Sequence, residues 1–421
     1  MAETEFTNTP RLPAETGQLQ VRLMEERTRR PIGGAQIHIT YEGEPDGEER
    51  DAVTDESGMT EMITLPAPNR EYSTSISEQQ PYAEYTIRAN ADGYEPTEVA
   101  GTEILPDETA IQEILMKRSV QTGEFDRIVI GPHTLFGNYP PKIAESEIKP
   151  MTESGEIVLS RVVIPEYVIV HDGAPSDSSA RNYWVRYRDY IKNVASSEIY
   201  ATWTDAAIRA NVLAIMSFVL NRVYTEWYRN RGYDFTITSS TAFDQKWIYG
   251  RNIYQNISNI VDEVFGNYLS RPNVKQPILT QYCDGRKVRC PGWMTQWGSC
   301  ELGEAGYSPI EILRNFYGDD MYINTAEQIS GIPASWPGYD LKIGAIGDKV
   351  RQLQEQLDAI SSVYTAIPDI SPDGIYGPAT AEAVRKFQSI FGLPQTGVVD
   401  FATWYKISHI YVGITRIAEL S

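Results

Sequence analysis

A long, nearly uncharged segment in the middle of the chain constrains the fold more than any other feature. Residues 208–231 read IRANVLAIMSFVLNRVYTEWYRNR, and apolar side chains would occupy nearly every face of a helix over its first turns. A helix that is apolar all round belongs in a core, so we expect a buried central helix. Thr204 or Asp205 can form its N-cap, and Gly232 can end it. The most apolar run, Val212 to Leu220, is too short to span a bilayer.

The chain is long enough for several domains and is strongly acidic. Its 421 residues are 41% hydrophobic and 22% charged, as in ordinary globular proteins. This length predicts roughly two to four domains. The net charge is −20, of which −14 falls in residues 1–120. Such a chain repels nucleic acid and anionic lipid, so we expect neither a nucleic-acid partner nor a membrane partner.

The N-terminus and the cysteines indicate where the chain is made. MAETEFTNTPRLPAETG has neither the basic nor the apolar region of an ordinary secretory signal. The three cysteines are Cys283, Cys290 and Cys300. An odd, low count is not typical of a secreted domain held by disulfides. We therefore expect synthesis in a reducing cytosol, with the cysteines either reduced or singly bridged.

Residues 18–118 are predicted to form an all-β module. Segments rich in β-forming residues, such as QLQVRLME, AQIHITYE and YTIRANA, lie between turns that contain Gly, Pro and Asp. The order PIGGAQIHI, TDESGMTEM, YTIRANADGYEP resembles the carboxypeptidase-regulatory-like β-sandwich, a small immunoglobulin-like fold. The module offers no obvious catalytic group, so its expected role is structural or regulatory.

Two further units follow a connector. Residues 119–165 are rich in Pro, Gly and Glu, and such connectors are often extended, exposed and open to proteases. Residues 166–325 form the largest predicted unit, in which strand-like EYVIVHDG leads into helical segments. A Pro/Gly linker over 326–340 precedes the last unit, 341–415. The expected fold class is multidomain α+β, with a β-sandwich, a central α+β unit and a C-terminal helical unit.

The last unit contains two related helical patterns. VRQLQEQL at 350–357 is echoed by AVRKFQ at 383–388, with GIYGP between them. Together with DGIYGPAT and GLPQTGVVD, they resemble the peptidoglycan-binding type 1 domain, a compact three-helix module. The resemblance implies peptidoglycan as a partner.

Histidine limits the chemistry that the central unit can support. His171 is the one histidine of the sequence between residues 166 and 325, whereas a zinc amidase or metallopeptidase needs two or three. The cysteines lack a CxxC knuckle, so we expect no metal and no cofactor. An acyl hydrolase would need His171 as its base. VIVHDGAPSD places it at a strand end, and the sequence has no GxSxG elbow.

Glu198 is the leading catalytic candidate. It follows Ala-Ser-Ser at 195–197, a predicted turn before the core helix, where apolar surroundings can raise the pKa of a general acid. A surface glutamate at a helix end is the plainer interpretation. Glycoside hydrolysis generally uses two carboxylates, and Asp189 or Asp205 could supply the second. Intramolecular attack by the C6 hydroxyl of the sugar, which closes a 1,6-anhydro ring, needs one carboxylate.

The residues around Glu198 resemble a known signature. YIKNVASSEIYATWTDAAIRANVLAIMSFVLNR is similar to the SpoIID-type lytic transglycosylase segment, whose matching glutamate is catalytic. VHDGAPSDSSARNYWV, FTITSSTAFDQKWIYGRNIY and residues 279–318 resemble the SleC-type spore cortex-lytic enzymes, which add a C-terminal peptidoglycan-binding domain. Some SpoIID-type enzymes carry a zinc site. Ser239, Ser240 and Thr241 stand in that region here, so zinc is not carried over.

The resemblance implies a zymogen of the spore. Its substrate would be the glycan strand of spore cortex peptidoglycan, and a subtilisin-like protease would remove an N-terminal pro-sequence by cutting within 119–160. The protein would reside in the cortex or coat region of the spore. A non-catalytic wall-binding spore protein and a two-carboxylate hydrolase remain alternatives.

Aromatic and polar side chains supply candidates for substrate binding, because an aromatic face packs against the C–H face of a sugar ring. The aromatic residues that crowd the central unit are Tyr167, Tyr183, Trp184, Trp247, Tyr249, Tyr282, Trp293 and Trp297. Most of them are expected in the core. The residues we single out for substrate binding are Ser239, Ser240, Gln245, Trp293, Gln296 and Trp297.

Overall fold

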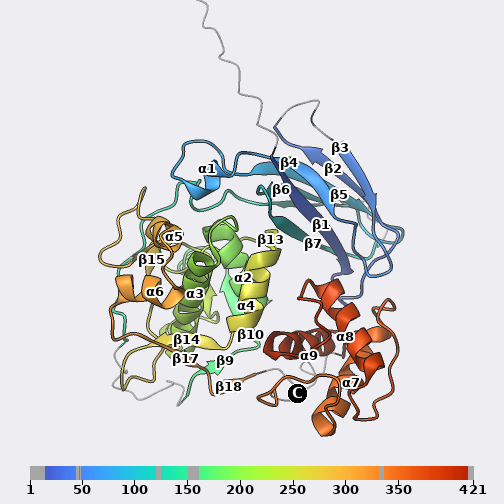
Figure 1. Ribbon diagram of the computed structural model, residues 1–421. Coiled ribbons are helices and arrows are strands. Elements are labelled where there is room, and N and C mark those ends of the chain that lie inside the picture. The colour runs from blue at the N-terminus through green and yellow to red at the C-terminus, as the bar shows by residue number, and fades with distance from the viewer. Residues whose placement is uncertain are drawn as a thin grey trace, which may run out of the picture.

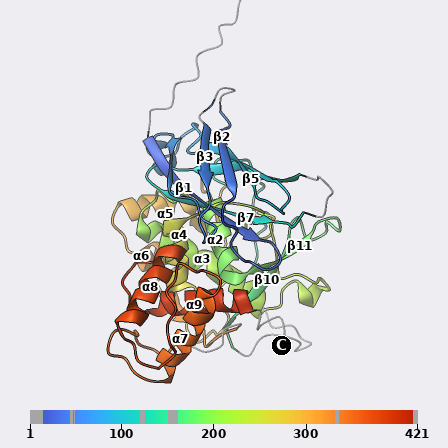
Figure 2. The same cartoon turned by 90° about the vertical axis from the view of Figure 1, so that its right-hand side faces the viewer.

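The computed structural model describes residues 15–43, 47, 49–119, 125–149, 161–330 and 336–415. β-Sheets built mainly from N-terminal residues lie on a central region of helices and short strands, and three C-terminal helices pack beside that region (Figure 1). The view at 90° shows the same three groups next to one another (Figure 2). The chain is therefore a mixed α/β protein.

Two sheets form the N-terminal region, with strand orders β13-β7-β1-β4 and β3-β2-β5-β6-β8. In β1, Leu19, Val21 and Leu23 are fully buried and alternate with partly exposed residues, as expected for a strand with one face on a core. The strands are β1 (Glu15–Glu25), β2 (Gln36–Tyr41), β3 (Glu49–Val53), β4 (Ile63–Ala67), β5 (Ala83–Asn90), β6 (Thr97–Ile104), β7 (Thr109–Met116) and β8 (Asp126–Val129), and the short helix α1 (Glu71–Thr74) follows β4.

Strands from outside 18–118 extend both sheets. β13 (Ile253–Tyr254) of the central region pairs with β7, and β8 of the connector pairs with β6. Open sheet edges carry unpaired N–H and C=O groups, which these strands satisfy. Next to them, the backbone of Glu103 exchanges two hydrogen bonds of 3.0 Å with the Asn252 side chain. The N-terminal sheets are thus joined to the central region by backbone pairing as well as by side chains.

The predicted core helix is α3 (Asp205–Tyr224), with Thr204 as its N-cap. It is long and apolar enough to cross a membrane by length and composition alone, but 83% of its apolar 18-residue stretch is buried inside the protein. The expected end at Gly232 is wrong. The Thr225 hydroxyl donates to the Asn221 carbonyl (2.7 Å), and Glu226 adopts a φ of 46°, which stops the helix. Gly232 ends a separate 3-10 turn, Arg229–Arg231.

Glu198 lies at the end of a helix and not in a loop. The expected turn at 195–197 is wrong, because these residues form the last turn of α2 (Tyr187–Glu198). They are fully buried, and the Ser196 hydroxyl accepts the N–H of Tyr254 (3.3 Å). Small side chains are needed here because β13 approaches the helix closely.

Short strands and helices complete the central region around α2 and α3. They are β9 (Val163–Ile164), β10 (Tyr167–His171), β11 (Asn182–Arg186), β12 (Ile237–Thr238), α4 (Gln255–Val264), β14 (Asn267–Ser270), β15 (Tyr282–Cys283), β16 (Met294–Thr295), α5 (Gln296–Glu304), α6 (Pro309–Tyr317), β17 (Tyr322–Thr325) and β18 (Gln328–Ile329).

The C-terminal helices are α7 (Asp348–Ser361), α8 (Pro378–Phe391) and α9 (Phe401–Thr415). The repeated sequence pattern has a structural reason. Gln354 in α7 and Gln388 in α8 are both buried, and each accepts the N–H of a glycine in the turn that follows its helix, Gly374 and Gly397 (2.8 Å each). Both glycines have positive φ, which L side chains adopt only with strain.

A buried ion cluster joins the C-terminal helices to the central region. Asp262 in α4 contacts Arg188 (3.1 Å) and Lys192 (2.7 Å) of α2, and Lys406 of α9 (3.5 Å). The Arg188 guanidinium also donates to the Tyr405 carbonyl of α9 (2.9 Å). Burial alone would raise the pKa of Asp262, but the three cations outweigh it and hold the pKa below its usual range.

We predict that Asp262→Asn strongly destabilises the protein, because it leaves three cations without their carboxylate. Breaking a buried ion pair costs about 3–5 kcal/mol. Glu263→Gln is the matched control, since the neighbouring Glu263 pairs with Arg209 at the surface, where such a pair contributes about 0–1 kcal/mol. Urea unfolding followed by tryptophan fluorescence measures both, and equal losses would contradict the prediction.

Candidate active site

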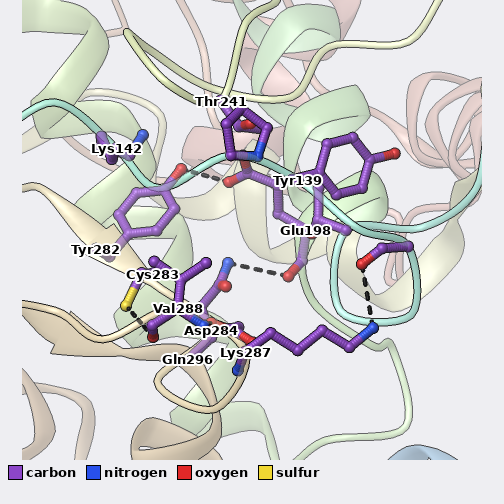
Figure 3. Close-up of a pocket in the computed structure, with 13 residues that line it drawn as sticks. Tyr139, Lys142, Glu198, Thr241, Tyr282, Cys283, Asp284, Lys287, Val288 and Gln296 are labelled. Carbon is purple, nitrogen blue, oxygen red and sulfur yellow. Dashed lines mark hydrogen bonds between the residues drawn. The ribbon is translucent and has the colours of Figure 1, made fainter.

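The carboxyl group of Glu198 is buried and hydrogen-bonded at both oxygens. Its side chain ends α2, and the residue is 3% exposed. Oε1 accepts the backbone N–H of Lys246 (2.7 Å), and Oε2 accepts the hydroxyl of Tyr282 (Figure 3). The interpretation of Glu198 as a surface charge at a helix end therefore does not describe its environment.

The environment favours the protonated form of Glu198. Burial raises the pKa of this carboxyl above its usual value. The Lys142 ammonium, the Tyr282 hydroxyl and the Lys246 N–H act in the opposite direction, but they do not cancel the effect of burial. The position at the C-terminal end of α2 adds to it, because the negative end of the helix dipole disfavours an anion. A carboxyl group of this kind can hold a proton nearer to neutral pH, as a general acid requires.

Gln245 and Gln296 position the groups around Glu198. The amide of Gln245 donates to the Tyr282 hydroxyl (3.1 Å) and to the Ile215 carbonyl of α3 (3.1 Å), which fixes the phenol against the core helix. The amide of Gln296 donates to the backbone carbonyl of Glu198 (3.0 Å) and so satisfies the end of α2. Both predicted residues therefore lie at the site, with Gln245 behind Tyr282.

The pocket at Glu198 is small. Its volume is about 60 Å³, which holds a few water molecules but no sugar ring, since ligand sites usually measure about 300–1,000 Å³. Its lining residues are Thr134, Gly137, Tyr139, Pro140, Lys142, Glu198, Thr241, Tyr282, Cys283, Asp284, Lys287, Val288 and Gln296. The first five belong to the connector, so the connector supplies much of the wall.

We call residues 130–149 the strap. This part of the connector departs from the expected exposed linker, because His133, Leu135 and Lys149 are at most 6% exposed. Thr134 donates its N–H to the carbonyl of Ser197 (3.0 Å), immediately before Glu198. The His133 ring stacks on Tyr200 at 4.4 Å between centroids.

Charged groups hold the strap over the pocket. The Lys142 ammonium donates to the Asp244 carbonyl and lies 5.0 Å from the centre of the Tyr282 ring. Glu145 pairs with the buried Arg222 of α3 (2.6 Å). Lys287 donates to the carbonyls of Phe136 and Gly137 from the opposite side (Figure 3). Lys142 is half-buried and lines the same pocket as the candidate catalytic carboxyl, whose charged form it stabilises.

The other predicted binding residues lie farther from the pocket. The Ser239 hydroxyl donates to Asp172 (2.8 Å), and Ser240 is half-buried. Trp293 is also half-buried, and neither Ser240 nor Trp293 lines the pocket. Trp297 is 7% exposed and packs against Trp203 at 5.5 Å in an aromatic cluster behind the site, so its position is that of a core residue.

The two carboxylates weighed as partners for Glu198 do not line its pocket. Asp189 is half exposed and faces His409, and Asp205 pairs with Arg209 one turn along α3. Asp284 does line the pocket. Its two oxygens accept the N–H groups of Lys287 (2.7 Å) and Val288 (2.9 Å). The Asp284-Gly285 pair is typical of a turn, so the sequence predicts a turn here. It does not predict that the turn lies close to Glu198.

Cys283 and Cys290 form a disulfide, and Cys300 is free and buried. The disulfide closes the loop that carries Asp284 and Lys287 to the pocket. Within the described parts of the chain, no three His, Cys, Asp or Glu residues come together as metal ligands. His171 is fixed by Asn182 (2.8 Å) and stacks on Phe235.

Sequence reasoning missed Lys142, Tyr139 and Lys246 at this site. Lys142 and Tyr139 lie in a segment that reads as a linker, and no local pattern points them toward Glu198. Lys246 contributes its backbone N–H, which any residue type could supply. Tyr282 appears among the aromatic candidates, but the hydroxyl contact that distinguishes it depends on the tertiary fold.

Comparison with known proteins identifies one part of the chain. Residues 346–407 match the family described as a putative peptidoglycan binding domain. The expected C-terminal peptidoglycan-binding module is thereby confirmed. Whether the central region is of the SpoIID or SleC type stays a prediction.

Two curated relatives and one solved structure match short parts of the chain. A 73-residue stretch is 38% identical to the zinc D-Ala-D-Ala carboxypeptidase of Streptomyces albus G, covering 17% of this chain and 27% of that protein. A 54-residue stretch is 44% identical to the N-acetylmuramoyl-L-alanine amidase CwlA of Bacillus subtilis (strain 168), covering 12% and 18%. The SleB N-terminal domain is 28% identical, covers 18% of this chain and 99% of its own, and has a TM-score of 0.16. The chain thus spans at most about a quarter of these two relatives.

We predict that Tyr282→Phe raises the pKa of Glu198 further, because the lost hydroxyl stabilises the charged carboxylate. Tyr317→Phe is the matched control, since its buried hydroxyl donates to the Gln281 carbonyl and not to Glu198. Carboxyl ¹³C NMR of glutamate-labelled protein measures the titration, with Glu198→Gln assigning the signal. An unchanged or lower pKa in Tyr282→Phe would contradict the prediction.

Proposed function

We propose that the chain is a peptidoglycan-cleaving lytic transglycosylase of the spore cortex, made as a zymogen, with Glu198 as its acid and base. The observation that supports this best is the buried carboxyl of Glu198, with its raised pKa, at the floor of a pocket. The peptidoglycan-binding module on the same chain supports the choice of substrate, because it holds an enzyme on an insoluble wall at high effective concentration. The names of the two relatives, a carboxypeptidase and an amidase, also belong to peptidoglycan chemistry.

One carboxyl group is enough for the proposed reaction. Protonated Glu198 gives its proton to the glycosidic oxygen as the bond from that oxygen to C1 of the muramic residue breaks. The carboxylate then accepts the proton of the C6 hydroxyl of the same residue, and O6 bonds to C1 to close the 1,6-anhydro ring. The Tyr282 hydroxyl and the Lys246 N–H stabilise the carboxylate between the two steps. Water is not consumed.

A hydrolase is the second candidate, and Asp284 is the observation that favours it. This carboxylate lines the pocket with Glu198, unlike Asp189 and Asp205. A hydrolase would use Asp284 to activate water or to attack the sugar, as paired carboxylates do in glycosidases. Because both oxygens of Asp284 hold the turn that follows it, we favour the reaction with one carboxyl.

We predict that Glu198→Gln lowers the rate of cortex cleavage by the activated protein about 10²–10⁴-fold, the usual contribution of a general acid and base. Asp189→Asn and Asp205→Asn keep the wild-type rate. Mass analysis of the wild-type products shows anhydro-muramic ends, which are lighter than reducing ends by one water.

Two results would overturn parts of this assignment. Full activity in Glu198→Gln removes Glu198 from the reaction. Reducing ends that take up labelled water make the protein a hydrolase, and Asp284→Asn then identifies the second carboxylate. A protein that binds cortex but never cleaves it is the non-catalytic spore protein.

The strap supports the zymogen proposal. It fills the space over Glu198, and Lys142 favours the charged carboxylate, the wrong form for a general acid. Both effects end when the strap leaves. Since the strap runs to Lys149, only a cut after that residue separates it from the central region. We therefore place the activating cut between residues 150 and 160, and a subtilisin-like protease of the spore as the partner that makes it.

We predict that the position of a cut decides activation. One variant carries the site of a specific protease at 120–124, before the strap, and a second carries it at 150–160, after the strap. Cleavage of the second yields cortex-lytic activity, whereas cleavage of the first leaves the strap attached and the protein inactive. Equal activity after both cuts would show that the strap does not block Glu198.

A further inference from the structure

A larger cavity lies beside the Glu198 pocket. Its volume is about 560 Å³, well within the range of about 300–1,000 Å³ for ligand sites. Tyr183 of β11 and the residues Lys246–Tyr249 line one side, and β8 with Gly131 of the strap lines the other. We call this cavity the aromatic groove.

Aromatic rings form one wall of the groove, where Tyr183 and Tyr249 are partly exposed and Trp247, 5% exposed, packs against them. The ring centres of Tyr183 and Tyr249 lie 5.1 Å apart in a stacked arrangement, and Trp247 lies 5.2 Å from Tyr183. Tyr249 is 38% exposed, so its ring remains open to a ligand. An exposed aromatic ring of this kind suits the C–H face of a sugar ring.

Polar groups lie beside the rings. Asp172, Arg181 and Lys246 line the groove. The Ser239 hydroxyl donates to Asp172 Oδ1 (2.8 Å) and fixes the orientation of that carboxylate. A few placed polar groups among aromatic ones are typical of ligand sites, and these can bind hydroxyl and N-acetyl groups. The predicted substrate-binding role of Ser239 would then be indirect, through Asp172.

Helix α2 fixes the position of the groove relative to Glu198. Lys246 donates its N–H to Glu198, at the end of α2. One turn earlier, the Asn193 side chain accepts the N–H of Ile248 (3.0 Å) and donates to its carbonyl (2.8 Å). The loop that carries Trp247 and Tyr249 is therefore pinned to α2 on both sides of Trp247. A ligand on these rings would lie at a fixed distance from the Glu198 carboxyl.

We propose that the aromatic groove is a glycan subsite that binds the β-1,4-linked amino-sugar strand next to the cleavage point. This inference rests on the proposed function for its substrate class. In the intact chain the groove has room for a sugar ring, whereas the Glu198 pocket, which the strap lines, does not. Tyr139 of the strap lies against Lys246, with the ammonium 5.3 Å from its ring centre. The intact protein therefore binds the strand without cleaving it. Release of the strap also removes the wall made by β8 and Gly131, and the remaining wall of Tyr183 and Lys246–Tyr249 then continues to the Glu198 pocket at Lys246.

The test compares Tyr249, the exposed ring of the groove, with Trp184 of β11, which lies outside the groove. Tyr183 and Trp184 point to opposite faces of the strand, and Trp184 is 70% exposed outside the groove. Binding of the soluble N-acetylglucosamine hexamer is measured by calorimetry on the full chain carrying Glu198→Gln. All variants keep the C-terminal module, so its contribution to binding is constant.

We predict that Tyr249→Ala weakens hexamer binding about tenfold, the upper range for loss of an aromatic contact. Tyr249→Phe keeps the ring and binds normally, and Trp184→Ala also binds normally. In the activated enzyme, Tyr249→Ala raises KM for cortex fragments and leaves kcat nearly unchanged.

Binding decides the inference independently of catalysis. If Tyr249→Ala binds as tightly as Trp184→Ala, or if Trp184→Ala is the variant that loses binding, the groove is not the subsite. If the activated wild-type protein fails to cleave cortex, the proposed function fails. The hexamer comparison still decides whether the groove binds glycan.

Discussion

The burial of α3 on all sides is the constraint on which the rest of the structure depends. An apolar helix without a solvent face must be covered by other elements, and α2, α4, α5, α6 and β14 pack around it. Its backbone then serves as a fixed reference for the site. Gln245 donates to the Ile215 carbonyl, and the Thr280 hydroxyl donates to the Ala214 carbonyl, two residues before Tyr282. The phenol that contacts Glu198 is thus held by the core helix from two directions.

The burial of Glu198 conflicts with access of a glycan strand to its carboxyl group, and the strap controls that access. Glu198 needs apolar surroundings to keep its proton, but a glycan strand needs access to the same carboxyl. In the intact chain the strap lines the pocket and leaves no room for a sugar ring, and its Lys142 opposes the effect of burial on the pKa of Glu198. It is held by several contacts spread along its length, from Thr134 on α2 to Glu145 on Arg222, and not by one strong bond. Such a segment stays in place while the chain is intact at both of its ends. It can leave once the chain is cut at one end.

Predictability from sequence differed between the elements of the site. Glu198 could be singled out because a short pattern surrounds it. Gln296 could be singled out because its stretch is rich in Gly and Cys and was expected to be irregular, although Gln296 in fact begins α5. Their contacts could not be predicted, since Tyr282 and Lys142 approach from segments 84 residues after and 56 residues before Glu198. For Trp297 the predicted role in substrate binding does not fit its position. Its side chain is of a type that binds sugars, but its ring packs in the core. Asp284 was missed because the Asp-Gly pair predicts only a turn. The structure has this turn, but it also brings Asp284 to the pocket.

The sequence by itself determined the buried helix, the acidic N-terminal β-region, the C-terminal helical repeat and the candidate carboxyl. Each of these depends on composition or on periodicity within one segment, which local physical chemistry dictates. Only the tertiary structure decided that the connector covers Glu198 and that β8 and β13 extend the N-terminal sheets. It also decided that an aromatic groove lies beside the pocket. These features depend on contacts between residues far apart in the chain, and no local pattern encodes which distant surface a segment will meet.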